Sequence, residues 1–141
     1  MKIFTCSIGV ALVALLPAAS SAQTKLTAIT GLPSNLELTQ SFIKNFIGTV
    51  NAKHKDVVNI RYVGGPEVVP PRKAGDAIRR GQFDMLHSPT AYYIGMVPEG
   101  YALTLSTNTP AQIRANGGFA LLEKIWAEKA NAKLLAWGEA G

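Results

Sequence analysis

After residue 22, short segments with the pattern of strands alternate along the chain with longer segments whose apolar residues recur every three or four positions, as in helices. Strands are predicted over 25–30, which alternates and is β-prone, over 57–63, which is rich in β-branched residues, and over 83–87. Turn-forming residues follow the first two. Two further strands are predicted over 101–105 and 133–137. Apolar positions spaced by three and four residues predict helices over 34–51, 71–80, 90–96 and 109–131. Strands that alternate with helices predict an α/β fold, with a mainly parallel sheet covered by helices on both faces.

The first of these helices has the clearest pattern. Its outward positions are expected to be Lys44, Asn45 and Asn51. The apolar stripe that faces the core is expected to consist of Leu36, Thr39, Phe42, Ile43, Phe46, Ile47 and Val50.

Two capping-box patterns mark helix starts. Ser34 precedes Glu37 by three residues, and Thr109 precedes Gln112 by three residues, so each pair can satisfy backbone N–H groups at a helix start. The double glycine at 117–118 is expected to bend or split the last helix, which Asn131 can close.

Residues 1–22 differ from the rest of the chain. One early cation, Lys2, precedes an apolar core from Ile8 to Leu16, and small residues end the segment at Ala22. The apolar core is about half of the ~20 residues that a membrane-crossing helix needs. These features are typical of a secretory signal peptide that is cleaved before Gln23.

Composition narrows the possible classes of protein. The 141 residues are 48% hydrophobic and 16% charged, with a net charge of +5, which fits one globular domain or less and disfavours a disordered chain, a polytopic membrane protein or a fibre. The cations are scattered, which disfavours nucleic-acid binding. The only cysteine, Cys6, lies in the signal peptide, and His54 and His87 are the only histidines, so we expect no disulfide and no metal site. An exported chain without cysteine indicates a bacterial periplasm, where binding proteins and hydrolases both occur.

Three loops that lead from strands to helices are the candidate binding elements. They cover residues 31–34, 64–71 and 87–90. In open α/β sheets the carboxyl ends of parallel strands and the following helix starts bind ligands, and helix starts favour anions. The loops therefore suit a solute with a carboxylate, although they can also serve only as turns.

The amino-acid sequences of several segments resemble those of a known protein family. The segments are Gly31-Leu32-Pro33, Gly64-Gly65-Pro66-Glu67-Val68-Val69-Pro70-Pro71, Gly81-Gln82-Phe83-Asp84-Met85 and Tyr92-Tyr93-Ile94-Gly95-Met96-Val97-Pro98-Glu99. Together with the signal peptide they resemble the amino-terminal part of the solute-binding proteins of tripartite (TRAP-type) transporters, the DctP family. The resemblance covers nearly all of residues 23–141.

The resemblance implies a periplasmic receptor that does no chemistry. Such a receptor has two α/β lobes of the type II periplasmic-binding-protein kind, closes over a small organic acid, and delivers it to a permease driven by an ion gradient. Residues 23–141 would be an incomplete amino-terminal lobe, a fragment without the second lobe and its carboxylate-clamping arginine. We expect a monomer that needs no cofactor. The residues that would line this lobe's side of the site are Thr30, Gly31, Glu67, Arg72, His87, Ser88, Pro89 and Tyr92.

Two alternatives remain. A receptor for an ATP-driven importer would share the two-lobe plan and differ in its membrane partner. A periplasmic α/β hydrolase would draw on Asp84, His87 and Ser88, but Asp84 and His87 should point to opposite faces of a strand, and the Gly-x-Ser-x-Gly motif is absent. We expect Asp84 to cap or to pair at the strand entrance, and His87 to pack or to line the loop. The glycine motifs of nucleotide-binding loops are also absent.

Overall fold

The computed structural model describes residues 22–137. The predicted signal peptide therefore lies outside the described residues, apart from Ala22.

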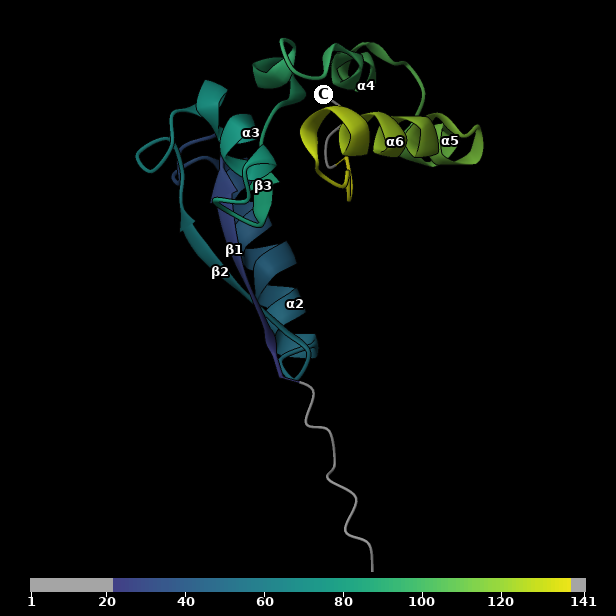
Figure 1. Ribbon diagram of the computed structural model, residues 1–141. Coiled ribbons are helices and arrows are strands. Elements are labelled where there is room, and N and C mark those ends of the chain that lie inside the picture. Colours follow the sequence, from purple (N-terminus) through teal and green to yellow (C-terminus); the bar gives the residue numbers. More distant parts are fainter. Residues whose placement is uncertain (1–21, 138–141) are drawn as a thin grey trace, which may run out of the picture.

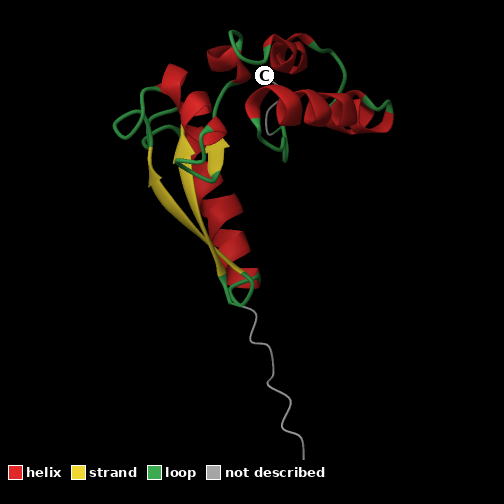
Figure 2. Cartoon of the chain, viewed as in Figure 1, coloured by secondary structure: helices red, strands yellow, loops and turns green. Residues whose placement is uncertain are grey.

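Three of the five predicted strands form a parallel sheet (Figures 1 and 2). They are β1 (Thr24–Thr30), β2 (Val58–Gly64) and β3 (Met85–His87), in the spatial order β2-β1-β3. Leu26 is the register partner of Ile60, and Thr30 is the partner of His87. The carboxyl ends of all three strands consequently lie at the same edge of the sheet.

The connections place helices on both faces of this sheet. The chain runs from β1 outward to β2 and then returns past β1 to β3, so the two crossovers run in opposite directions. Because parallel crossovers are right-handed, the helix between β1 and β2 and the helix between β2 and β3 lie on opposite faces. The second of these is α3 (Pro71–Arg79), which contacts both β1 and β3.

The helix between β1 and β2 contains a segment with wider turns. It consists of α1 (Glu37–Ser41), the π-helical segment η1 (Phe42–Ile47) and α2 (Gly48–Lys53). Ile47 joins Ala28 and Ile60 in a buried cluster, and Phe42 and Val50 pack against it. Within the predicted stripe, however, Leu36 is 41% exposed, because it is the N-cap and precedes the first helical turn. Phe46 is 39% exposed, because the π-helical turns rotate the apolar positions away from one line.

Two details of this helix differ from the prediction. Leu36 is its N-cap and Ser34 makes no capping hydrogen bond, so the first capping box does not form. Asn51 does not point outward: its Nδ2 donates to the carbonyl oxygen of Ile60 (2.8 Å), and its Oδ1 accepts from the Ile60 N–H (2.7 Å).

The second half of the described chain is helical. It contains the 3₁₀ turns η2 (Thr90–Tyr93) and η3 (Pro98–Tyr101), followed by α4 (Ala102–Leu105), α5 (Pro110–Ala115) and α6 (Gly118–Ala130). In Figure 1, α5 and α6 extend sideways from the end of the sheet at which the strands finish.

The strands predicted over 101–105 and 133–137 are wrong. Residues 102–105 form α4, and residues 132–137 have no regular structure. The apolar residues of both segments pack within the helical half. Leu103 lies in a buried cluster with Ile113, Phe119 and Leu122, and Leu134 and Trp137 pack against this cluster. The apolar runs therefore belong to a helical core rather than to the sheet.

The predicted signals around α5 and α6 are confirmed. Thr109 and Gln112 form a complete capping box. Gly117 separates the two helices in a left-handed conformation (φ 83°), which favours glycine, and Asn131 closes α6 with φ 48°.

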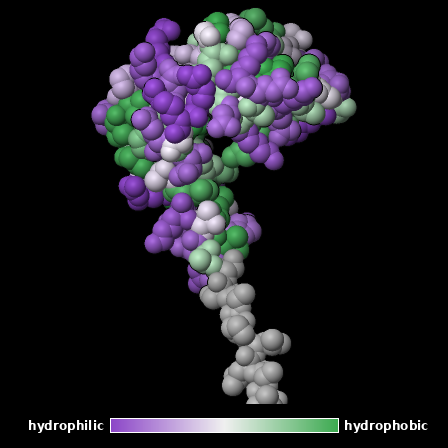
Figure 3. Space-filling view, in the orientation of Figure 1, coloured by the Kyte–Doolittle hydropathy of each residue, from purple (hydrophilic) through white to green (hydrophobic). Residues whose placement is uncertain are grey.

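The surface mixes polar and apolar residues. Figure 3 shows hydrophobic atoms interspersed with hydrophilic ones over both the sheet and the helical half on the visible face. The most exposed large hydrophobic residues are Leu105 (71%), Val57 (63%) and Leu121 (60%). Within residues 22–137, no helix combines the length and apolar character needed to cross a bilayer.

Candidate functional site

The ends of β1 and β3 form the centre of the candidate site. From β1 the chain leaves toward β2 on one side, whereas β3 lies on the other side of β1. Such a reversal of strand order is where ligands bind in open α/β sheets. Thr30 and His87 are register partners here, and the Gly31 N–H donates to the His87 carbonyl oxygen (2.9 Å). Four predicted site residues, Thr30, Gly31, His87 and Ser88, are thereby brought together.

Gly31 and Ser88 approach closely across the two strand ends. A Cβ atom added at Gly31 would lie 2.0 Å from Ser88 Oγ and 2.8 Å from Ser88 Cβ. Both distances are shorter than any van der Waals contact allows, so Ser88 can occupy its position only because residue 31 has no side chain.

Tyr93 fixes Ser88 from the other side. Its hydroxyl donates a hydrogen bond to Ser88 Oγ (2.6 Å), and the side chain is only 4% exposed. The ring lies against α3, where a Cβ at Gly75 would be 2.8 Å from Tyr93 Cδ1, and meets the Trp126 ring edge-on with centroids 6.4 Å apart. Burial raises the pKa of Tyr93 to about 12, and this effect outweighs the lowering by the Ser88 hydrogen bond. The phenol is therefore a permanent donor at neutral pH.

Thr30 is almost fully buried, at 1% exposure. Its hydroxyl donates to the carbonyl oxygen of Leu32 (2.8 Å) and lies 3.1 Å from the Tyr62 hydroxyl of β2. Thr30 therefore fixes the loop after β1 from inside.

Glu67 lies in the loop after β2. Its Oε1 accepts from the Gly65 N–H (2.7 Å), and this hydrogen bond is the main reason that the pKa of the Glu67 carboxyl lies below its ordinary value. A Cβ at Gly65 would be 3.2 Å from both Glu67 Oε2 and Thr30 Oγ1, so this loop packs against the end of β1. Because its carboxylate is exposed and ionised, Glu67 would repel an anion rather than attract it.

His87 packs on an aromatic side chain of the neighbouring helix, in agreement with the prediction. Its ring stacks on Phe42 with centroids 4.7 Å apart and an interplanar angle of 10°. The π-helical segment η1 supplies this partner. The predicted site residue Pro89 follows Ser88 as the N-cap of η2.

Asp84 lies at the opposite end of β3 from Ser88. Its Oδ2 accepts from the N–H and the hydroxyl of Thr27, both at 2.7 Å, which confirms the predicted pairing at the strand entrance. These hydrogen bonds hold the pKa of the Asp84 carboxyl below its usual value. Four residues along a strand span about 13 Å. Asp84 and Ser88 are thus too far apart for a catalytic triad.

Arg72 and Tyr92 lie at a different place from the other predicted residues. They line a hollow of about 300 Å³ between α3 and η2, together with Asp76, Arg79 and Tyr93. Arg79 Nη2 forms an ion pair with Asp76 Oδ1 at 2.9 Å. Tyr93 joins the two places, since it lines the hollow and its hydroxyl binds Ser88.

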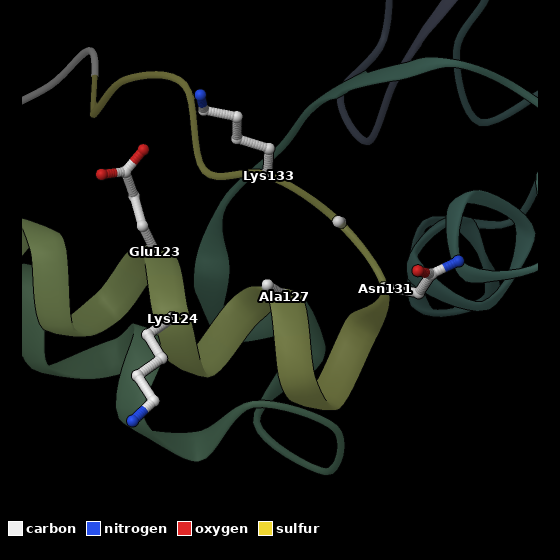
Figure 4. Close-up of a pocket in the computed structure, with 6 residues that line it drawn as sticks. Glu123, Lys124, Ala127, Asn131 and Lys133 are labelled. Atoms are coloured by element: carbon white, nitrogen blue, oxygen red, sulfur yellow. The ribbon is translucent and has the colours of Figure 1, made fainter.

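A larger hollow, about 510 Å³, lies at the end of α6. It is lined by Glu123, Lys124, Ala127, Asn131, Ala132 and Lys133. Figure 4 shows the Glu123 and Lys133 side chains reaching to the same side, whereas Lys124 points away from them. This hollow contains none of the predicted site residues.

Three residues that contribute to the site were not predicted. They are Phe42, Tyr62 and Tyr93. The sequence identifies the segment that contains Tyr92 and Tyr93 as part of the site. Which of the two rings points inward depends on the 3₁₀ geometry of η2. Within the described part of the chain, no three His, Cys, Asp or Glu side chains gather in a way that could hold a metal ion.

No protein-family model matches the sequence. Among solved structures, a TRAP transporter solute-binding protein from Bordetella bronchiseptica matches with a TM-score of 0.66 and 22% identity, over 76% of this chain and 34% of its own. A TRAP periplasmic solute-binding protein from Pseudoalteromonas atlantica matches with a TM-score of 0.64 and 17% identity, over the same shares. The first was solved with copurified calcium and picolinate in an active site, the second with sodium and pyruvate.

These matches confirm the resemblance at the level of the fold. The chain has the fold of part of a TRAP transporter solute-binding protein, a periplasmic-binding-protein-like α/β fold with a parallel sheet. It spans about a third of the length of these two neighbours. Both neighbours are solute-binding proteins.

Proposed function

We propose that this chain is part of a periplasmic receptor that captures a small organic acid for a transporter driven by an ion gradient. The observation that carries the proposal is the fold match to two TRAP solute-binding proteins over 76% of the chain. The reversal of strand order between β1 and β3 supports it, because the predicted residues Thr30, Gly31, His87 and Ser88 meet where such sheets bind ligands.

The ligands of the two neighbours support the solute class. Picolinate and pyruvate are both small carboxylates. The site offers the partly buried hydroxyl of Ser88, and a hydroxyl is a suitable hydrogen-bond donor for a carboxylate. Residues 23–141 would supply one lobe's side of the site, and the guanidinium clamp would belong to a second lobe. One lobe covers one side of a solute, so we expect millimolar affinity for this chain alone.

A titration followed by NMR tests solute binding. The ¹⁵N-labelled chain is titrated with pyruvate, with picolinate and with pyruvamide, the neutral amide of pyruvate. We expect the two acids to shift the amide signals of Gly31, Gly65 and Ser88, and pyruvamide to have a much weaker effect. Lys124, at the hollow of α6 that contains none of the predicted site residues, serves as the internal control. Shifts confined to α6, or no shift with either acid at about tenfold above the expected millimolar Kd, would contradict the proposal.

A separate experiment tests export. Residues 1–22 are fused to a periplasmic reporter in a Gram-negative host, next to a fusion that lacks residues 2–16. We expect only the first fusion to reach the periplasm, with a new amino terminus at Gln23. Retention of the first fusion in the cytoplasm would contradict the periplasmic location without affecting the titration.

A further inference from the structure

The hydroxyl groups at the carboxyl edge of the sheet differ in what they can offer to a solute. A hydroxyl has one hydrogen to donate and can accept two hydrogen bonds. A carbonyl oxygen can only accept a hydrogen bond, so the Thr30 hydroxyl must donate its hydrogen to the carbonyl oxygen of Leu32, 2.8 Å away. Tyr62, at 3.1 Å, is then the donor toward Thr30 Oγ1. Thr30 consequently has no hydrogen left for a carboxylate.

Ser88 is in the opposite situation. Its Oγ accepts the hydrogen of the Tyr93 phenol at 2.6 Å. The Ser88 hydroxyl makes no other hydrogen bond within the described part of the chain, so its own hydrogen is uncommitted. Ser88 is also only partly buried, in contrast to Thr30.

The donor on Tyr93 is held firmly in place. The ring is packed between Gly75 of α3 and Trp126 of α6, and the side chain is 4% exposed. The hydrogen-bond geometry makes Tyr93 the donor and Ser88 the acceptor. Burial keeps the phenol protonated well above neutral pH, so this donor hydrogen is present at neutral pH. Gly31 leaves the space in which Ser88 Oγ sits, so the serine is confined from both sides.

We propose that Tyr93 is the positioning residue of this site: by donating to Ser88 Oγ it turns the Ser88 hydrogen outward, so that Ser88, and not Thr30, donates to the solute carboxylate. This inference rests on the proposed function and adds to it the atom that recognises the anion. Tyr93 itself touches no solute and acts through Ser88.

A double-mutant cycle with pyruvate as the probe tests this proposal. The full chain and its Ser88→Ala, Tyr93→Phe and doubly substituted variants are titrated by NMR. We expect Ser88→Ala to weaken pyruvate binding about tenfold or more, the range for a hydrogen bond to a charged group. Tyr93→Phe keeps the buried ring and should weaken binding about threefold, but it should have no further effect when residue 88 is alanine. Tyr101→Phe, in η3, is the matched control and should bind as the parent chain does.

The outcomes separate the two proposals. If the parent chain gives no shift at the strand ends with pyruvate or picolinate, the proposed function and this inference both fail. If pyruvate binds but Ser88→Ala leaves its affinity unchanged, or Tyr93→Phe weakens binding equally in both backgrounds, only the inference fails. Should Tyr93→Phe not fold, as judged by urea unfolding, Ser88→Ala alone decides: a tenfold loss supports the proposal and an unchanged affinity overturns it.

Discussion

Asn51 binds both backbone groups of Ile60. The amide of this α2 side chain donates to the carbonyl oxygen of Ile60 and accepts from its N–H, at 2.8 and 2.7 Å. Ile60 belongs to β2, an edge strand, and is 4% exposed. One side chain therefore takes the place of a neighbouring strand at this edge and covers a position where another chain could pair.

Replacing Asn51 should destabilise the fold. Asn51→Ala leaves a buried N–H and a buried carbonyl without partners, and each unsatisfied group costs about 1–3 kcal/mol. We expect the free energy of unfolding in urea to fall by about 2 kcal/mol or more. Asn45→Ala, on the exposed side of η1, is the control and should change stability much less. Equal losses for the two variants would show that the Ile60 hydrogen bonds contribute nothing.

Asp84 should make stability depend on acid pH. Its folded pKa is lowered by the two Thr27 hydrogen bonds, so the ionised form stabilises the folded state. This contribution is complete at neutral pH, declines as the pH falls below the ordinary value of 3.8, and is lost once the pH passes the lowered pKa. Asp84→Asn should be less stable than the parent at pH 7.

The comparison between the parent and Asp84→Asn isolates this group. Glu67 and Glu99 also have lowered pKa values, but they are present in both proteins and cancel in the difference. Urea unfolding at several pH values should show the difference shrinking toward zero in acid. A difference that stays constant with pH would contradict the role of the charge.

Gly31 should be intolerant of any side chain. Gly31→Ala would place Cβ 2.0 Å from Ser88 Oγ, so the strand ends must separate or Ser88 must move. Overpacking of this kind costs about 1–3 kcal/mol. Gly95→Ala is the matched control, because no heavy atom lies within 4 Å of an added Cβ there. Thermal unfolding of both variants should show a clear loss for Gly31→Ala only, and similar midpoints would contradict the close approach.

The two capping-box patterns should respond differently to the same substitution. Thr109→Ala removes a side-chain acceptor from the Gln112 N–H at the start of α5 and should cost about 1 kcal/mol. Ser34→Ala should be nearly neutral, since Ser34 makes no capping hydrogen bond. Urea unfolding measures both. A larger effect for Ser34→Ala would indicate that the sequence pattern, and not the structure, identifies the cap.

The α/β order was predictable because the local period and the turn residues agreed around β1, β2 and α3. The prediction was wrong where an apolar run was the only signal for a strand. Residues 101–105 and 133–137 are apolar enough for strands, but Leu103, Leu134 and Trp137 pack on the cluster around Phe119, which no local pattern reveals. Similarly, the short spacing of Ser34 and Glu37 permits a cap, yet the chain begins its helix after Leu36.

The candidate site was predictable only as far as strand ends could be located. Thr30, Gly31, His87 and Ser88 meet because parallel strands finish at one edge. Arg72 and Tyr92 instead line the hollow between α3 and η2, since their direction depends on how those two elements pack. The roles of Phe42 and Tyr62 depend on contacts between segments that are distant in the sequence.

The tight contact between Gly75 and Tyr93 has a consequence for natural variation. With only 2.8 Å between an added Cβ at position 75 and the ring at position 93, the two residues share a fixed volume. Chains of this fold that carry a larger residue at position 75 should carry a smaller one at position 93, and those that do so lose the phenol. Covariation at these two positions would thus divide related sequences into those with a tyrosine-held serine after β3 and those that bind their solutes by other groups.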